Sequence, residues 1–249
     1  MDWPPPSGPP GVVAMWAPPR AQGTVPGRVA ALALAVTVVG LLLSRVVASL
    51  LIDTGVDPVA VIAAVGLFGY GLPLVAFVSV RSSLGAPGRD ALGLRARWAD
   101  LGWGPVTWLC CLVVQAVVGM LVLRSGVPFE GNAPDLGDDG GLPASYVVAL
   151  LLLTVVAAPV VEEIVFRGMV LRALMSTMPV GAAVAVQGVL FGLAHVDPSR
   201  GIGNIGLVIL LSSVGCVLGG AAVLTRRLAA PMIAHAIVNA LAMAIALLA

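Results

Sequence analysis

The chain has no lysine and few charged residues of any kind. Among its 249 residues, 13 basic residues, all of them Arg, and 12 acidic residues make up 10%, whereas 59% are hydrophobic and the mean hydropathy is +1.07. A soluble globular domain carries about 25% charged residues, so this composition excludes one and indicates a polytopic membrane protein. The net charge of +1 also argues against a nucleic-acid partner.

Cysteine is equally scarce, and its positions exclude a cysteine-based framework. The three cysteines, Cys110, Cys111 and Cys216, lie in apolar segments. We therefore interpret them as small hydrophobic side chains that form neither a disulfide framework nor a cysteine zinc site. The chain also lacks the HExxH pattern that is typical of many zinc proteases.

Long apolar runs, in contrast, are abundant. Residues 1–27 are rich in Pro and Gly and have no periodicity, so we expect a disordered tail there. The remainder predicts an all-α fold, a polytopic transmembrane helical bundle of about seven spans within a range of roughly six to eight. The expected spans are residues 28–52, 59–80, 103–123, 145–176, 179–196, 203–224 and 229–248.

Arginine is concentrated in the loops on one side of the predicted spans. Arg near the ends of spans is retained on the cytoplasmic side during membrane insertion. The sequence therefore predicts an integral, multi-pass protein of the cell (plasma) membrane with a cytoplasmic N-terminus and an external C-terminus. The arginines on the predicted cytoplasmic side are Arg20, Arg28, Arg81, Arg89, Arg95, Arg97, Arg226 and Arg227.

Two of the three Glu in the chain are adjacent, in the apolar stretch AAPVVEEIVFRG. An ionisable side chain inside a membrane helix costs at least about 2.5 kcal/mol, so it generally faces the protein interior and has a partner. Glu163 and Arg167 are four residues apart, which favours an ion pair on one helical face. Glu162 is then left for proton chemistry. The alternative is a packing salt bridge that both Glu serve.

Both His of the chain also lie in apolar surroundings. His195 closes the segment FGLAH one turn after Phe191, and His235 opens HAIVN one turn before Asn239. The spacing of four places His235 and Asn239 on one face of a helix. These side chains are candidates for catalysis, and hydrogen bonding between helices is the alternative use for them.

Helix lengths indicate whether the Glu and His residues can meet. A turn at STMPV leaves two arms of about 24 Å each, so Glu162 and His195 reach similar depths on neighbouring antiparallel helices. His235 is only about 12 Å along its helix from Arg226, which is a different depth. A kink near Gly168, helix tilt or a last helix that begins outside the bilayer would reconcile the two. From the position of His235 we expect the site to open on the cytoplasmic side.

Three segments together resemble a known family. EEIVFR, FGLAH and HAIVN are similar, in the same order, to the EExxxR, FxxxH and HxxxN/D motifs of the CAAX-protease and bacteriocin-processing (CPBP, or Abi) intramembrane proteases, which are Rce1-like. The resemblance covers roughly residues 145–249, with a weaker similarity at LGLRARWADLG. We therefore divide the chain into the tail (1–27), N-terminal transmembrane helices (28–144) and a CPBP-like catalytic transmembrane domain (145–249).

The resemblance implies an intramembrane endopeptidase that hydrolyses a peptide bond of a membrane-associated protein or peptide within the lipid bilayer. Glu162 and His195 would activate a water molecule, and His235 and Asn239 would donate hydrogen bonds to the oxyanion. The supporting residues would be Glu163, Arg167 and Phe191.

Metal dependence and function both leave alternatives open. Glu162, His195 and His235 could supply the three protein ligands of a catalytic zinc ion, and the same groups could act without metal, which we favour. A non-catalytic membrane scaffold or immunity-type regulator of the same family is the first alternative function. A proton-coupled transporter that uses one Glu as a relay is the second. The sequence specifies neither the substrate nor the oligomeric state.

Overall fold

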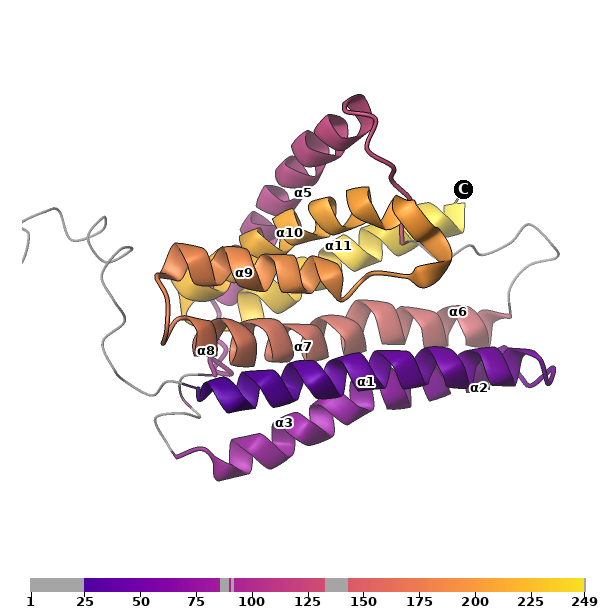
Figure 1. The fold of residues 1–249 in the computed structure, drawn as a ribbon, viewed down its shortest axis with the longest axis horizontal. Coiled ribbons are helices and arrows are strands. Elements are labelled where there is room, and N and C mark those ends of the chain that lie inside the picture. The colour runs from indigo at the N-terminus through magenta and orange to yellow at the C-terminus, as the bar shows by residue number, and fades with distance from the viewer. Residues whose placement is uncertain (1–24, 86–89, 91, 133–142, 249) are drawn as a thin grey trace, which may run out of the picture.

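The structure is a computed structural model that describes residues 25–85, 90, 92–132 and 143–248 (Figure 1). Residues 1–24 of the expected tail lie outside the described residues, as does Ala249. Within them, every regular element is a helix. In chain order, these are α1 (Gly27–Ile52), α2 (Pro58–Val65), η2 (Gly66–Gly71), α3 (Leu72–Ser83), α5 (Asp100–Arg124), α6 (Ala144–Leu151), η3 (Leu152–Ala157), α7 (Ala158–Glu163), η4 (Ile164–Val170), α8 (Leu171–Leu174), α9 (Val180–Leu193), η5 (Pro198–Gly203), α10 (Asn204–Thr225) and α11 (Ala229–Leu248).

Six helical runs are long and apolar enough to cross a membrane, which confirms the predicted polytopic helical bundle. The seventh, α9, is shorter than expected. It ends at Leu193 and has 14 residues, so it is about 21 Å long against about 30 Å for a hydrocarbon core. The expected span over residues 179–196 was therefore too long. Because α9 is short, His195 lies just past its last turn, beside neighbouring helices that continue farther.

Helix boundaries follow from local backbone chemistry. The Asp57 side chain accepts a hydrogen bond from the backbone N–H of Val59, and Pro58 occupies the first turn of α2. The turn predicted at STMPV is confirmed, because α8 ends at Leu174 and α9 begins directly after Pro179. Three segments are π-helical: η2 and η3, of six residues each, and η4, of seven residues. Each of them shifts the direction in which later side chains point.

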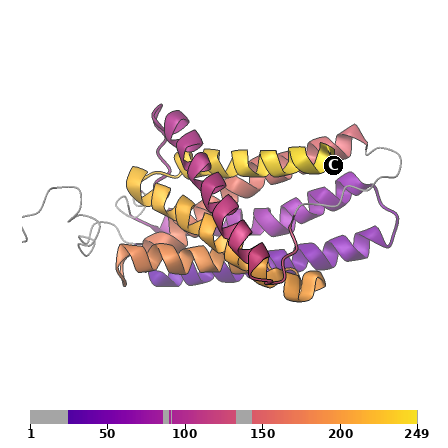
Figure 2. The same cartoon turned by 90° about the horizontal axis from the view of Figure 1, so that it is seen from above.

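The helices form two groups that meet along the continuous run α6–α8, which we call the long helix. Figure 1 shows α1, with α2 and α3, on one side of the long helix and α9, α10 and α11 on the other. Seen from above in Figure 2, α5 crosses the second group diagonally, in contact with α10 and α11. Glu162 and Glu163, in the interior of the long helix, therefore lie between the two groups.

Glycine allows α9 and α10 to approach each other closely. A Cβ atom added at Gly188 would lie 2.8 Å from the carbonyl oxygen of Ser212, and one at Gly215 would lie 2.9 Å from Cα of Gly188. A side chain at either position would force the helices apart. Small residues spaced four apart, such as Gly188 and Gly192, are the usual means of tight helix packing in membranes. The close approach also brings the carbonyl oxygen of Gly215 within reach of the long helix.

The start of α11 explains how His235 reaches the depth of the Glu pair. The backbone N–H of Leu228 donates to the carbonyl oxygen of Gly93 at 2.9 Å, and a Cβ at Gly168 would lie 3.3 Å from Leu228 Cδ1. The last helix therefore begins beside Gly168 in η4, deeper in the bundle than Leu174, where the long helix ends. From that level, His235 is about 10 Å along α11 and Glu163 about 8 Å along the long helix. The depth conflict in the sequence thus came from assuming that all helices begin at one level.

A salt bridge holds the turn before α11 in this place. Arg227 binds Asp100 at 2.7 Å, and the Asp100 side chain is only 2% exposed. The hydrogen bond to Asp100 raises the pKa of Arg227, so the guanidinium stays charged. Asp100 also accepts a hydrogen bond from the backbone N–H of Arg97. The segment LGLRARWADLG is therefore the part of the chain that supports the start of α11.

Candidate active site

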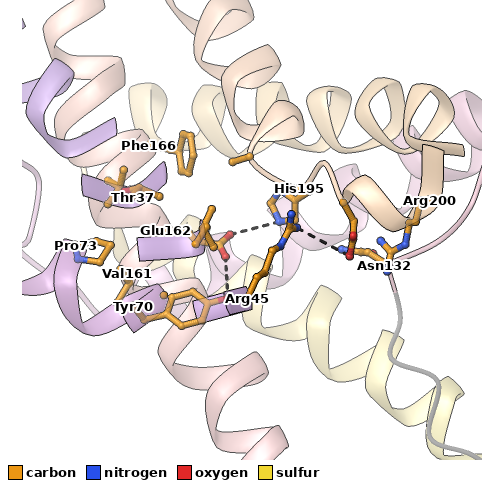
Figure 3. Close-up of a pocket in the computed structure, with 15 residues that line it drawn as sticks. Thr37, Arg45, Tyr70, Pro73, Asn132, Val161, Glu162, Phe166, His195 and Arg200 are labelled. Atoms are coloured by element: carbon orange, nitrogen blue, oxygen red, sulfur yellow. Dashed lines mark hydrogen bonds and ion pairs between the residues drawn. The ribbon is translucent and has the colours of Figure 1, made fainter. Parts of the chain in front are cut away.

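The structure brings the four candidate catalytic side chains into one cavity. Glu162 comes from α7, His195 from the loop directly after α9, and His235 and Asn239 from α11. Figure 3 shows Glu162 pointing towards His195. Their proximity was expected from the sequence, whereas their catalytic roles remain a prediction.

Glu163 and Arg167 form the ion pair that their spacing predicts. Arg167 donates to Oε1 of Glu163 at 2.8 Å, and both side chains are fully buried. A second nitrogen of Arg167 donates to the carbonyl oxygen of Gly215 on α10 at 3.2 Å. A buried charge is tolerated only when it is paired and hydrogen-bonded, and this arrangement supplies both.

His235 is attached to the same ion pair. Its Nδ1 lies 2.9 Å from Oε1 of Glu163. The sequence predicted that Glu163 supports the neighbouring carboxylate, and the structure adds that Glu163 links the long helix to α11. Because an ionised carboxylate only accepts hydrogen bonds, Nδ1 of His235 carries a proton. Nε2 of His235 is then an acceptor when the ring is neutral and a donor when the ring is protonated.

His195 is fixed in the same tautomer by a different partner. Its Nδ1 lies 2.8 Å from the carbonyl oxygen of Phe191, which can only accept. Nε2 of His195 and Nε2 of His235 each lie 3.8 Å from Oε2 of Glu162. Among the described residues, this buried oxygen has no hydrogen-bond partner. With both imidazoles neutral, the two Nε2 atoms and Oε2 of Glu162 are three acceptors that lie together with no donor between them.

Phe191 packs among these groups, as its place in the motif suggests. Its ring centroid is 4.8 Å from that of His195 and 5.7 Å from that of His235. The guanidinium of Arg167 lies 4.3 Å from the Phe191 centroid, within cation–π range. Phe191 thus separates the buried ion pair from the polar cavity and limits the rotation of both imidazoles.

Asn239 is held by the π-helical segment of the long helix. Its side-chain N–H donates to the carbonyl oxygen of Thr154 in η3 at 2.8 Å. An irregular turn frees such a carbonyl from the regular helical pattern, and a neighbouring helix can then satisfy it. The amide of Asn239 has a second N–H. Asn239 can therefore be anchored to the long helix and still donate into the cavity that it lines.

Two cavities of about 230 and about 280 Å³ meet at the candidate site. Tyr70, Asn132, Glu162 and His195 line both of them. The first extends between α1 and the long helix towards polar residues of the loops. The second extends towards α5, α10 and α11. Its remaining lining residues are Gln115, Thr154, Ala158, Phe191, Leu211, Val214, His235, Val238, Asn239, Ala242 and Met243.

The polar end of the first cavity lies opposite the end expected from the sequence. Its lining includes Arg45, Asn132, Asp197 and Arg200, which cluster where α10 begins, whereas Arg226 follows the other end of α10. The lining therefore favours an opening at the end away from Arg226, whereas the sequence placed it towards Arg226, and the side on which the site opens stays a prediction. The sequence estimate relied on the distance along α11 and did not foresee that this helix begins inside the bundle.

Hydrogen bonds join the two sides of this polar end. Arg45 of α1 donates to the carbonyl oxygen of Val196 at 2.8 Å and lies 4.0 Å from Asp197. Hydrogen bonds from Ser199 keep the pKa of Asp197 below its usual value, so its carboxylate remains ionised. The loop that carries His195 is thereby attached to α1.

Tyr70 is the main site residue that sequence reasoning missed. Its hydroxyl group donates to Oε1 of Glu162 at 3.5 Å, as Figure 3 shows. Arg45 was also missed, although a lone charge inside a predicted span is a signal that could have revealed it. The signal for Tyr70 is weaker: a phenol between two glycines in the apolar segment GLFGYG.

The donor types at the site suit zinc better than their arrangement does. Each imidazole has its Nδ1 occupied and its Nε2 directed at Glu162, which is typical of metal-binding His. Ligands of tetrahedral zinc, however, lie roughly 3.3 Å apart, since zinc bonds to N and O are near 2.0 Å. The separations here are 3.8 Å, and the described residues contain no group of three potential ligands arranged to hold a metal ion. We therefore derive no step through a metal.

Comparison with known proteins agrees with the motifs. Residues 144–241 match the family model described as type II CAAX prenyl endopeptidase Rce1-like. Neither the comparison with curated proteins nor the comparison with solved structures gives a match. The matched segment contains Glu162, His195, His235 and Asn239. Over residues 144–241 the chain is therefore Rce1-like, as its three motifs predicted, and this similarity supports a membrane protease of the CAAX type.

Proposed function

We propose that this protein is an intramembrane endopeptidase that hydrolyses a peptide bond of a membrane-associated protein or peptide. The observation that carries the proposal is the meeting of three acceptors, Oε2 of Glu162 and Nε2 of both His, at a polar cavity. A water molecule has two donors and one nucleophilic oxygen, so a water beside these groups can donate to two of the acceptors and direct its oxygen at a substrate carbonyl.

The residues support a direct hydrolytic mechanism. Glu162 takes a proton from the water as the water oxygen attacks the carbonyl carbon of the substrate, and the carbonyl oxygen becomes an oxyanion. His195 then helps to carry this proton to the amine nitrogen as the C–N bond breaks. The products are a new carboxyl terminus and a new amino terminus, with the catalytic groups returned to their starting state.

Stabilisation of the oxyanion is assigned differently to the two residues of the HxxxN motif. Asn239 can donate with its free N–H in every state of the reaction. His235 has its Nδ1 proton committed to Glu163, so it can donate through Nε2 only while it is protonated. We therefore infer that Asn239 is the permanent oxyanion donor, whereas a neutral His235 supports the site through its contact with Glu163.

The surroundings of the site favour hydrolysis over proton-coupled transport. A transporter requires a polar path across the bilayer. Beyond the Glu pair, residues 164–170 of the long helix are all buried, and apart from Arg167 they are apolar. Two nitrogens of Arg167 donate to Glu163 and to the carbonyl oxygen of Gly215. Along the long helix, the residues that line the two cavities therefore end at Phe166, which favours a pocket over a path that continues along this helix.

The test compares membrane proteomes of cells that produce the wild-type protein, Glu162→Gln or Glu130→Gln. Glu130 is the matched control, because it is the third Glu of the chain and its side chain is 61% exposed in an ion pair with Arg200. We expect a protein fragment that appears with the wild type and with Glu130→Gln and is missing with Glu162→Gln. The absence of any fragment that depends on Glu162 would favour the scaffold alternative.

A further inference from the structure

We propose that Tyr70 is a positioning residue that orients the Glu162 carboxylate for water activation. This inference rests on the proposed function and extends it to a residue outside the family match, which begins at residue 144. Tyr70 donates its phenol O–H to Oε1 of Glu162, and it lines both cavities at the point where they meet.

The two oxygens of Glu162 face different partners. Oε1 lies next to the Tyr70 hydroxyl group at 3.5 Å, whereas Oε2 lies 3.8 Å from Nε2 of His195 and from Nε2 of His235. A Glu side chain has three rotatable bonds, and its last torsion is broad. A donor on Oε1 restricts this torsion and keeps Oε2 directed at the imidazoles. Tyr70 therefore acts through Glu162 and need not contact the substrate.

The local backbone places Tyr70 for this contact. Tyr70 belongs to η2, whose π-helical turns rotate later side chains relative to α2. Its neighbour Gly69 packs against Ser44 of α1, and a Cβ at Gly40 would collide with the carbonyl oxygen of Phe68. Gly40 thus allows η2 to lie directly against α1, which holds the phenol ring between α1 and the long helix.

The phenol also suits an apolar site chemically. Tyr is neutral and offers one donor, so it can bind an ionised carboxylate without bringing a second charge into the membrane. An Arg or a protonated His at this place would form an ion pair with Glu162 and weaken it as a base. A phenol restrains the carboxylate and leaves it able to accept a proton.

The experiment compares Tyr70→Phe with Tyr146→Phe, the matched control, because these are the two Tyr of the chain and Tyr146 lies on α6 outside both cavities. The first readout is the amount of the Glu162-dependent fragment in membranes. The second is modification of Glu162 by dicyclohexylcarbodiimide, an apolar reagent that reacts with protonated carboxyl groups, measured by peptide mass spectrometry. Glu162→Gln gives the background of the second readout.

We expect Tyr70→Phe to reduce the fragment about ten-fold and to speed modification of Glu162 about three- to ten-fold, as for the loss of one hydrogen bond. Tyr146→Phe should leave both unchanged. If Glu162 is modified at the wild-type rate in Tyr70→Phe, the contact between Tyr70 and Glu162 is overturned. If Glu162 is modified faster but Tyr70→Phe cleaves normally, the positioning role of Tyr70 is overturned. A wild-type protein that gives no fragment would overturn the proposed function itself, while the labelling would still decide whether the contact exists.

Discussion

Nδ1 of His235 and Oε1 of Glu163 lie 2.9 Å apart, so two motifs that are 72 residues apart in the chain share one hydrogen bond. The same carboxylate oxygen accepts from Arg167. The two adjacent Glu residues therefore have different surroundings. Glu163 is fully buried and bound to Arg167 and His235, whereas Glu162 is 16% exposed and faces the cavity. We therefore expect different effects from substitutions at the two positions.

Glu163→Gln is expected to destabilise the protein, because it leaves the fully buried guanidinium of Arg167 without its counter-charge. Breaking a buried pair in this way costs roughly 3–5 kcal/mol. The measurement is the thermal unfolding midpoint of purified protein in detergent. Glu162→Gln is the matched comparison and should keep a midpoint close to that of the wild type. Equal midpoints for both variants would contradict the division of roles.

Asn239→Ala is expected to lower cleavage roughly 10²- to 10³-fold, the loss typical of an oxyanion donor. The protein should remain folded, because the Thr154 carbonyl that loses its donor lies at the cavity and can bind water instead. Cleavage is measured as the rate at which the Glu162-dependent fragment appears. Thr154→Val, which retains that backbone carbonyl, serves as the control. Cleavage by Asn239→Ala at the wild-type rate would remove Asn239 from the mechanism.

Access to the site is testable with single-cysteine variants. In a background that lacks the native cysteines, Ala194→Cys probes the first cavity and Arg226→Cys probes the opposite end of α10. An impermeant thiol reagent should label the two from opposite sides of the membrane. With the orientation that the arginines predict, Arg226→Cys reacts from the cytoplasm and Ala194→Cys from outside. Labelling of both variants from the cytoplasm would instead place the opening on the cytoplasmic side, as the sequence suggested.

Gly188→Ala is expected to disturb the site from a distance. Its new methyl group would collide with the backbone of Ser212, so α9 must shift, and α9 carries His195 at its end. Overpacking of this kind costs about 1–3 kcal/mol. Gly181→Ala in the same helix has no atom within 4 Å of its new Cβ and is the control. We expect a lower unfolding midpoint and less cleavage for Gly188→Ala alone, and equal behaviour of the two variants would show that α9 and α10 are not tightly packed.

Metal dependence gives a further prediction. Because the candidate ligands of Glu162, His195 and His235 are spaced more widely than zinc requires, we expect purified protein to retain cleavage in a chelator and to bind less than one zinc per chain. Metal content is measured by mass spectrometry of the purified protein. Loss of cleavage in chelator that returns with zinc would instead assign these three side chains as ligands.

Much of this arrangement is readable from the sequence, because the informative residues are scarce. A chain with two His and three Glu offers few possible constellations, and spacing alone pairs Glu163 with Arg167. Helix spacing could not reveal the Glu163–His235 contact, because it depends on how two helices pack. The starting level of α11 was equally hidden, since it is set by contacts of Leu228 with Gly93 and Gly168.

The residues missed at the site belong to the first half of the chain. Tyr70 and Arg45 reach Glu162 and the loop of His195 from η2 and α1, and neither is part of the three motifs. The π-helical turn that directs Tyr70 has no clear pattern in GLFGYG, so periodicity predicts an ordinary span there. Motifs thus predicted which candidate side chains meet at the cavity, whereas packing determined which neighbours contact them.

Cleavage of a peptide by the purified protein in water enriched with oxygen-18 tests the central claim most directly. The peptide is taken from the parent protein of the Glu162-dependent fragment. Hydrolysis by an activated water predicts one oxygen-18 atom in the new carboxyl terminus with wild-type protein, and no cleavage with folded Glu162→Gln. Cleavage by Glu162→Gln at the wild-type rate, with the label in place, would show that hydrolysis does not use Glu162 and would contradict the account.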